Sequence, residues 1–276
     1  MFFWLVGGDI PDAVRCAATI RSRFSTLRYM KVIKRMNPIQ RGHVISNGFS
    51  FLLELPEHLM IPMTLTQWLL DHISYDGVFQ HKSKTFVFNK EMINVIFGFD
   101  DGHIPFVFNS DDPAVIEEVN VIRAKYGASS ELSMERLVSI MLGDNTEVGF
   151  MRSFILFFIS TILCPLTYNG VNLKYLFSLR DVSQFRNLNY ASLCYDHLFT
   201  EVEKFKEKRF DVVNSSDYNR RLWVGGCLPV FGVSNSVVLS LFFPDILFCS
   251  FLYFVFLYQL FICTGSILGF LCFEWS

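Results

Sequence analysis

The chain has 276 residues, a formal net charge of −2 and 51% hydrophobic residues. This balance excludes a strongly basic nucleic-acid-binding chain and an acidic disordered chain, and it supplies enough apolar side chains for a substantial core. All 24 Lys and Arg residues precede position 232, and the last 45 residues hold only Asp245 and Glu274 as charged residues. We therefore expect an N-terminal extension (1–19), a domain (20–231) and an apolar tail (232–276).

The seven cysteines include no C-x-x-C pair, and the six histidines lack zinc-ligand spacing. This pattern argues against a disulfide framework and against a zinc cage. Cys164, Cys194 and Cys227 are instead predicted to be small buried residues in a reducing compartment. The chain begins with the apolar run Met1–Val6, which is too short for a signal peptide and lacks the basic segment that precedes such a run in secreted proteins. The expected location is therefore nuclear or cytoplasmic.

The first predicted helix lies in a basic stretch, since residues 13–53 contain eight Lys or Arg and no acid. Ser22 is predicted to cap it, and Asn37-Pro38 to end it near Met36. Its apolar face is formed by residues at a spacing of three: Phe24, Leu27, Met30 and Ile33.

Five basic residues fall largely away from that apolar face: Arg21, Arg28, Lys31, Lys34 and Arg35. One interpretation is a solvated face on a packed helix. The other is a helix that contacts phosphate groups of a nucleic acid through the basic segment 15–41. The sequence leaves both interpretations open, and these five residues are its candidate nucleic-acid-binding site.

The next elements are predicted from caps and periodicity. Thr64 and Gln67 have capping-box spacing ahead of a short amphipathic helix, and residues 77–88 are typical of a small β-hairpin. Asn89 is predicted to cap a helix that Gly98 ends in a left-handed conformation. A helix at 113–125 and another capped by Ser133 are expected to follow.

Residues 150–163 are apolar on nearly every side, which predicts a buried central helix that Cys164-Pro165 ends. Fourteen residues reach only about 21 Å, short of the roughly 30 Å hydrocarbon layer of a membrane. A last long helix begins at Asn187 or Asn189, with Glu201 on its charged outer face. Residues 211–220 are expected to form an exposed loop, and 222–231 another apolar element.

Several short segments, in this order, resemble the plant mobile domain, which is also labelled aminotransferase-like. The segments are Arg23-Phe24-Ser25, Gln40-Arg41, Gly48-Phe49, Trp68-Leu69, Val95-Ile96-Phe97-Gly98-Phe99, Thr161-Ile162-Leu163-Cys164-Pro165, Tyr175-Leu176, Asp181-Val182, Asn189-Tyr190-Ala191 and Val224-Gly225-Gly226-Cys227-Leu228. The resemblance covers roughly 20–231. It implies a mainly α-helical, transposon-related domain, with host relatives associated with the nucleus and with transposon silencing.

No chemical activity is evident in the sequence. It has no phosphate-binding G-x-x-x-x-G-K-[ST] or G-x-G-x-x-G motif, no H-E-x-x-H zinc motif and no G-x-S-x-G motif. An aminotransferase would need a lysine that forms a Schiff base with pyridoxal phosphate, a partner for the pyridine nitrogen and a phosphate-binding site, and the sequence identifies none of these. We therefore expect no catalytic residues, no cofactor and no metal, and a non-enzymatic interaction domain with unknown protein partners.

The tail allows two interpretations. Of its 45 residues, 35 are Phe, Leu, Ser, Cys, Tyr, Val or Ile, whose codons contain T, as in a translated T-rich intron. Alternatively, 246–273 is 28 residues without a charge, and as a helix of about 42 Å it would cross a membrane as a single anchor. The fold class expected overall is mainly α, with the hairpin at 77–88 and this apolar tail.

Overall fold

The computed structural model describes residues 20–59, 63–81, 84–100, 102–127, 132–214 and 222–231. In chain order the elements are β1 (Ile20–Ser22), α1 (Thr26–Ile33), α2 (Pro38–Ser46), η2 (Ser50–Leu53), α3 (Met63–His72), β2 (Val78–His81), β3 (Lys84–Val87), α4 (Lys90–Phe97), α5 (Pro113–Ala124), β4 (Leu132–Ser133), α6 (Met134–Gly143), α7 (Glu147–Phe158), η3 (Ile159–Leu163), β5 (Gly170–Val171), η4 (Leu173–Phe177), η5 (Val182–Asn187), α8 (Tyr190–Asn214) and β6 (Leu222–Val224). The η elements are 3₁₀ helices, except η3, which is a π-helical turn. The prediction of a mainly α fold is confirmed.

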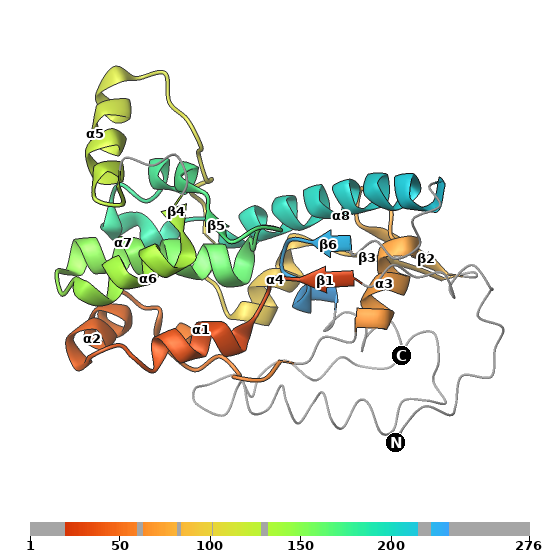
Figure 1. Cartoon of the computed structure of the whole chain (residues 1–276), viewed down its shortest axis with the longest axis horizontal. Coiled ribbons are helices and arrows are strands. Elements are labelled where there is room, and N and C mark those ends of the chain that lie inside the picture. Colours follow the sequence, from red (N-terminus) through yellow and green to blue (C-terminus); the bar gives the residue numbers. More distant parts are fainter. Residues whose placement is uncertain are drawn as a thin grey trace, which may run out of the picture.

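The arrangement of the helices follows from α7, which lies in the interior (Figure 1). Helices α2 and α6 pack against α7, while α1 and α8 contact η3, its continuation. Ten consecutive residues of α7, from Gly149 to Phe158, are buried, as are all five residues of η3. The predicted central helix is therefore confirmed.

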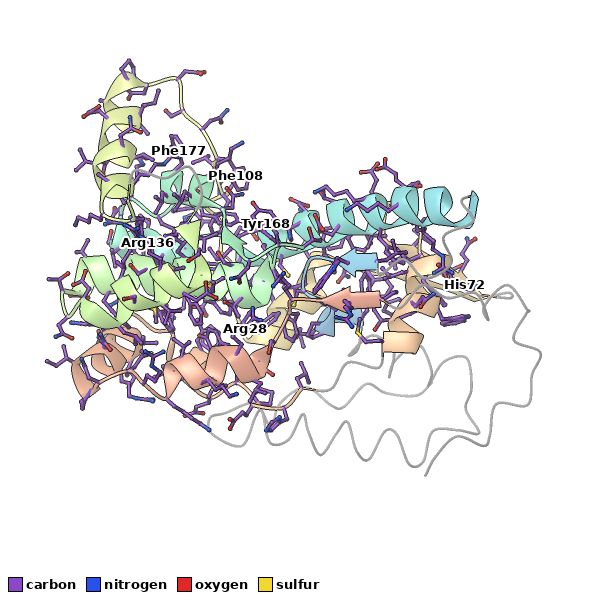
Figure 2. The ribbon with its side chains drawn as sticks, viewed as in Figure 1. Arg28, His72, Phe108, Arg136, Tyr168 and Phe177 are labelled. Carbon is purple, nitrogen blue, oxygen red and sulfur yellow. The ribbon has the colours of Figure 1, made fainter. Side chains whose placement is uncertain are left out.

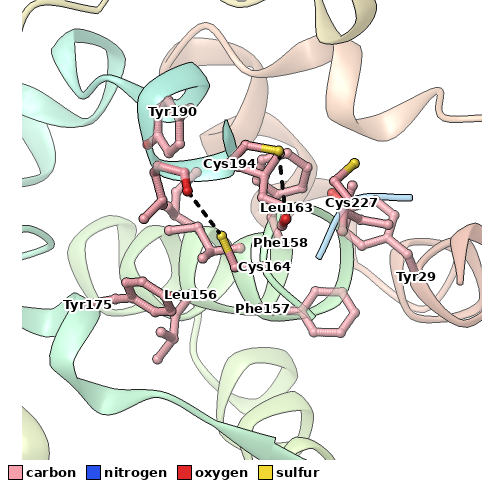
Figure 3. Packing of buried hydrophobic residues seen from close by; sticks show 14 of the residues in the cluster. Tyr29, Leu156, Phe157, Phe158, Leu163, Cys164, Tyr175, Tyr190, Cys194 and Cys227 are labelled. Carbon is pink, nitrogen blue, oxygen red and sulfur yellow. Dashed lines mark hydrogen bonds between the residues drawn. The ribbon is translucent and has the colours of Figure 1, made fainter. Parts of the chain in front are cut away.

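Aromatic rings fill the space around this central helix (Figure 3). The ring of Phe157 stacks on Tyr29 of α1, with centroids 5.3 Å apart and planes 6° from parallel. Phe158 meets the rings of Phe97 and Phe99 edge to face. Such contacts add to the free energy gained by removing the rings from water.

Within the described ranges the strands form three short two-stranded pairs, and one of these is a hairpin. Strands β2 and β3 form the expected antiparallel hairpin, with Val78 opposite Val87. Strands β1 and β6 pair in parallel, with Ile20 opposite Leu222. This second pair brings the first and the last described segments side by side in the centre of the molecule (Figure 1), and the sequence did not predict it.

Several helix boundaries agree with the predictions from capping residues. Asn89 caps α4 by accepting a hydrogen bond from the Met92 backbone, and Gly98 ends that helix at φ 69°. Ser133 caps α6. The predicted helix at 113–125 is α5. The helix predicted from Thr64 is α3, but the side chain of Thr64 lies outside the described part of the chain.

The first helix differs from its prediction. Ser22 is the last residue of β1, and Ser25 caps α1 instead, because its hydroxyl accepts the Arg28 backbone N–H. Both serines fit the sequence pattern, but pairing with β6 holds Ser22 in an extended strand. Asn37 does not merely follow a helix end: together with Gln40 it forms the capping box of α2, which the sequence analysis missed.

The last helix also needs two corrections. Helix α8 continues to Asn214, so residues 211–214 are helical rather than part of the predicted loop at 211–220. Glu201 was placed on the outer face and is in fact only 6% exposed. Its Oε2 accepts a hydrogen bond from the Gly225 backbone at 3.2 Å, which compensates for burying the carboxylate.

In the ranges that the structure describes, no helix combines the length and the apolar character needed to cross a membrane. The predicted anchor at 246–273 lies outside those ranges.

Replacing Phe157 with Ala should lower the free energy of unfolding by about 3–5 kcal/mol, because it leaves a cavity beneath Tyr29 in a fully buried layer. Urea denaturation of the full chain measures this. The matched control is Val148→Ala on the same helix: Val148 is 51% exposed, and its change should stay within about 0.5 kcal/mol. Equal effects of the two substitutions would contradict the central position of α7.

Candidate nucleic-acid interface

The basic residues nominated from the sequence lie on the outside of β1 and α1. Arg21, Arg28, Lys31, Lys34 and Arg35 are all exposed. Helix α1 is held from its other side by buried Tyr29, Met30 and Ile33. The structure therefore separates the apolar and basic sides of this helix as expected. We call Arg28, Lys31, Lys34 and Arg35 the α1 basic face.

One member of the α1 basic face already has an acidic partner. Lys34 Nζ lies 2.6 Å from Glu57 Oε2, at side-chain exposures of 59% and 34%. The hydrogen bond from Lys34 lowers the pKa of the Glu57 carboxyl, and the charges of His58 and Lys31 act in the same direction. An exposed pair of this kind contributes little to stability, so Lys34 can exchange Glu57 for another anion at small cost.

Arg23 is a functional candidate that the sequence analysis did not nominate. Its Nε donates a hydrogen bond to the Thr167 carbonyl at 3.1 Å, and its guanidinium lies 4.9 Å from the ring centroid of Trp223. These two contacts fix the side chain from two sides. Only the fold brings residues 144 positions apart into this contact, so no local sequence signal identified it.

Arg23 and Arg28 share a depression that encloses about 240 Å³ of empty space, open solvent included. Its lining is drawn from four parts of the chain: Arg23, Arg28, Met134, Ser160, Thr161, Leu166, Tyr168, Asn169 and Gly170. We call it the arginine pocket. Figure 2 shows Arg28 at the end of α1 nearest β1, with Tyr168 on the loop before β5. The Tyr168 ring covers Gly170 so closely that a Cβ atom at that position would collide with it.

An acid lies near the arginine pocket. Asn169 Nδ2 donates to both carboxylate oxygens of Glu135, at 2.9 and 3.1 Å. This hydrogen bonding holds the pKa of Glu135 below its ordinary value, and the positive charge of Arg28 contributes to the same shift. The pocket lining thus contains two guanidinium groups and no carboxylate, and Glu135 lies near enough for the charge of Arg28 to act on it.

A second depression of similar size lies on another side of the chain. It is lined by Gly48, Phe49, Phe51, Phe99, Asp100, Arg186 and Tyr190. Arg186 and Asp100 form an exposed ion pair at 2.6 Å. The Tyr190 hydroxyl is buried and has no hydrogen-bond partner within the described ranges, and burial raises its pKa well above the ordinary value. The surroundings are aromatic, so this depression offers little to a charged ligand.

The three cysteines predicted to be buried are free thiols in the core (Figure 3). Cys194 Sγ donates to the Leu163 carbonyl at 3.7 Å, and Cys164 Sγ donates to the Leu193 carbonyl at 3.9 Å. Burial raises the pKa of both thiols well above the ordinary value. Because the thiolate is the nucleophile and the metal ligand, these two groups are held in their unreactive form.

Gly225 and Gly226 serve as a docking point for α8 rather than as a phosphate cradle. A Cβ atom at Gly225 would lie 2.5 Å from Glu201 Oε2, and Gly226 adopts φ 81° while its N–H donates to the Pro165 carbonyl. His197 lies one turn before Glu201, and burial lowers its pKa despite the opposing effect of the Glu201 charge. These contacts fix helix position, which accounts for the glycines.

The family comparison overturns the resemblance drawn from the sequence. A family model described as "Domain of unknown function (DUF8566)" matches residues 22–231, and the chain belongs to this family. The resemblance to the plant mobile domain is therefore wrong. Most of its supporting segments are helix caps, apolar stripes and packed glycines, which recur wherever helices of similar length pack together. No curated protein and no solved structure matches the chain.

The buried thiols provide a test of this part of the core. In the native full chain, Cys164 and Cys194 should resist alkylation by iodoacetamide, because they are buried and protonated. Peptide mapping by mass spectrometry measures the labelling at each cysteine. The same sites should react fully after denaturation in urea, which is the control. Fast labelling of either thiol in the native chain would show that the core is open there.

Proposed function

We propose that the domain is a non-enzymatic binding module that contacts the phosphate backbone of a nucleic acid through the α1 basic face. The observation that carries this proposal is the exposure of Arg28 and Lys31 on α1, a helix that contains no acid, and of Arg35 just after its end. Within the described ranges, the side chains of these three residues form no ion pair. Solvated cations of this kind displace counterions from a nucleic acid.

The support is local rather than global, because the chain as a whole is slightly acidic. A single basic face on a neutral domain favours weak, salt-dependent contact with phosphates over tight sequence-specific binding. Arg21 lies on β1, at the strand that precedes α1, and extends the same basic segment. The compartments consistent with this role are the nucleus and the cytoplasm.

Replacing Arg28, Lys31 and Arg35 together with Glu should lower the affinity for double-stranded DNA by about tenfold or more, because fewer counterions are released when fewer phosphates are neutralised. Fluorescence anisotropy over about 50–200 mM salt measures the affinity. The slope of log K against log salt should become shallower by about 0.9 for each phosphate that the variant no longer neutralises.

The control is a second triple variant: Lys125→Glu, Lys174→Glu and Lys208→Glu. These lysines are exposed at the end of α5, on η4 and on α8, so the net charge changes equally while the α1 basic face is intact. DNA affinity in the control should stay within about twofold to threefold of the unmodified chain at physiological salt, since long-range charge is screened. Equal losses in the two triple variants would contradict a localised interface.

Membrane attachment through 246–273 is a second candidate function, and the sequence supports it through 28 uncharged residues. Val255→Lys with Leu260→Lys should release the full chain from lipid vesicles in a flotation assay. Each charge near the middle of a span costs about 2.5–3.5 kcal/mol. Val237→Lys with Ser240→Lys, outside the span, should leave flotation unchanged. Identical behaviour of the two variants would contradict an anchor at this position.

A further inference from the structure

We infer that the arginine pocket binds a single phosphate group, with one oxygen directed at Ser160 and the others facing Arg23 and Arg28. This deepens the proposed function, on which it rests for the source of the phosphate, by naming the group that is bound and the residues that hold it. Three features of the pocket point to a phosphate: the orientation of Arg23, the unpartnered hydroxyl of Ser160 and the size of the enclosed space.

Arg23 is held in place before any ligand arrives. Its Nε is engaged by the Thr167 carbonyl and its plane rests against Trp223, so the two terminal nitrogens keep their donor capacity. A guanidinium fixed in this way loses little side-chain entropy on binding, and its planar fork matches the oxygens of a phosphate. Arg28 adds a second guanidinium from α1, and it forms no side-chain hydrogen bond or ion pair within the described ranges.

Ser160 supplies the second and independent observation. It lines the pocket, it is only 5% exposed, and its hydroxyl has no hydrogen-bond partner within the described ranges. A buried hydroxyl without a partner is costly, so a site of this kind favours a ligand oxygen. Thr161 beside it does not share this property, because its hydroxyl already donates to Met134 Sδ at 3.7 Å.

The backbone around Ser160 departs from an ordinary α-helix. Residues Ile159–Leu163 form the π-helical turn η3, in which the Cys164 N–H donates to the Ile159 carbonyl at 2.7 Å. Single π turns inside helices occur frequently at functional sites, because the inserted residue changes the direction in which nearby side chains project. The wider turn thus sets Ser160 against the loop that carries Tyr168 and Asn169.

The enclosed part of the pocket is small enough to admit one oxygen of a phosphate group. The enclosed part has room for about one water-sized group, which is the size of a phosphate oxygen, and the rest of the space opens to solvent. A phosphate group therefore enters with one oxygen and remains at the mouth with the others. Glu135 opposes this binding through its negative charge, although Asn169 and Arg28 stabilise that charge.

Titration of the full chain with inorganic phosphate, at constant pH and with chloride at matched ionic strength as the reference, tests the site without nucleic acid. Isothermal titration calorimetry should detect saturable binding. Arg23→Gln and Arg28→Gln should each weaken it by about tenfold, as expected for the loss of a charge-assisted hydrogen bond. The inference is overturned if the unmodified chain does not bind phosphate, or if the two variants bind phosphate as tightly as the unmodified chain.

Three further variants separate ligand binding from a structural role. Ser160→Ala should weaken phosphate binding by about threefold to tenfold without lowering the melting temperature, because its hydroxyl bonds to nothing in the described fold. Glu135→Gln should strengthen binding, since it removes the opposing charge. Arg35→Gln, beyond α1 and outside the pocket, should change nothing. A lower melting temperature of Ser160→Ala with unchanged phosphate affinity overturns the inference.

The source of the phosphate is distinguished with a pair of oligonucleotides that differ only in a 5′-phosphate. Tighter binding of the phosphorylated oligonucleotide identifies a terminal phosphate as the ligand. Equal binding of the two oligonucleotides that Ser160→Ala weakens identifies a backbone phosphate. If Ser160→Ala leaves the binding of both oligonucleotides unchanged, the result counts against the pocket. Lys31→Glu with Arg35→Glu should weaken DNA binding but leave the phosphate titration intact. Failure of the proposed function and failure of the pocket are therefore separate results.

Discussion

The structure depends on the burial of α7 from Gly149 to Phe158. Most side chains in this stretch are apolar, and its one charged side chain, Arg152, is only 5% exposed. Its Nε donates to the Leu179 carbonyl at 2.7 Å and its terminal nitrogen to the Arg180 carbonyl at 2.8 Å. Burial still lowers the pKa of this guanidinium, so the carbonyl contacts are what make the position tolerable. One charged side chain thereby fixes the segment between η4 and η5 against the central helix.

That constraint also shapes the binding surface. Once α7 and η3 occupy the interior, α1 must lie across η3 with its apolar side inward, and its cations are left facing water. The parallel pairing of β1 with β6 then places Trp223 beside Arg23. The arginine pocket therefore depends on both ends of the family domain, which spans 22–231: Arg23 lines the pocket, and Trp223, outside the lining, supports Arg23.

What the sequence revealed follows a physical division between local and distant interactions. Asn89 and Ser133 were identified as caps because a capping side chain bonds to a backbone group three residues away. Ser22 was mistaken for a cap because its partner strand, β6, is about two hundred positions away along the chain. Glu201 was predicted to face solvent because the sequence pattern of its own helix does not show that the Gly225 backbone donates a hydrogen bond to its carboxylate. The basic face could be predicted because its residues lie within one short stretch of sequence. Arg23 and Ser160 could not, because only tertiary contacts bring them into the same pocket.

Arg23 in the arginine pocket and the exposed cations of the α1 basic face differ in how much side-chain entropy they lose when a phosphate binds. Lysines on an exposed helix are mobile, and a phosphate that engages them must restrict long side chains, which costs up to about 2 kcal/mol each and leaves an interaction that salt screens. Arg23 has already lost most of that freedom through Thr167 and Trp223. A phosphate in the pocket is thus positioned by the fold, whereas phosphates along α1 are held by charge density alone. The pocket would set where a strand lies, and the α1 basic face would determine how strongly that contact responds to ionic strength.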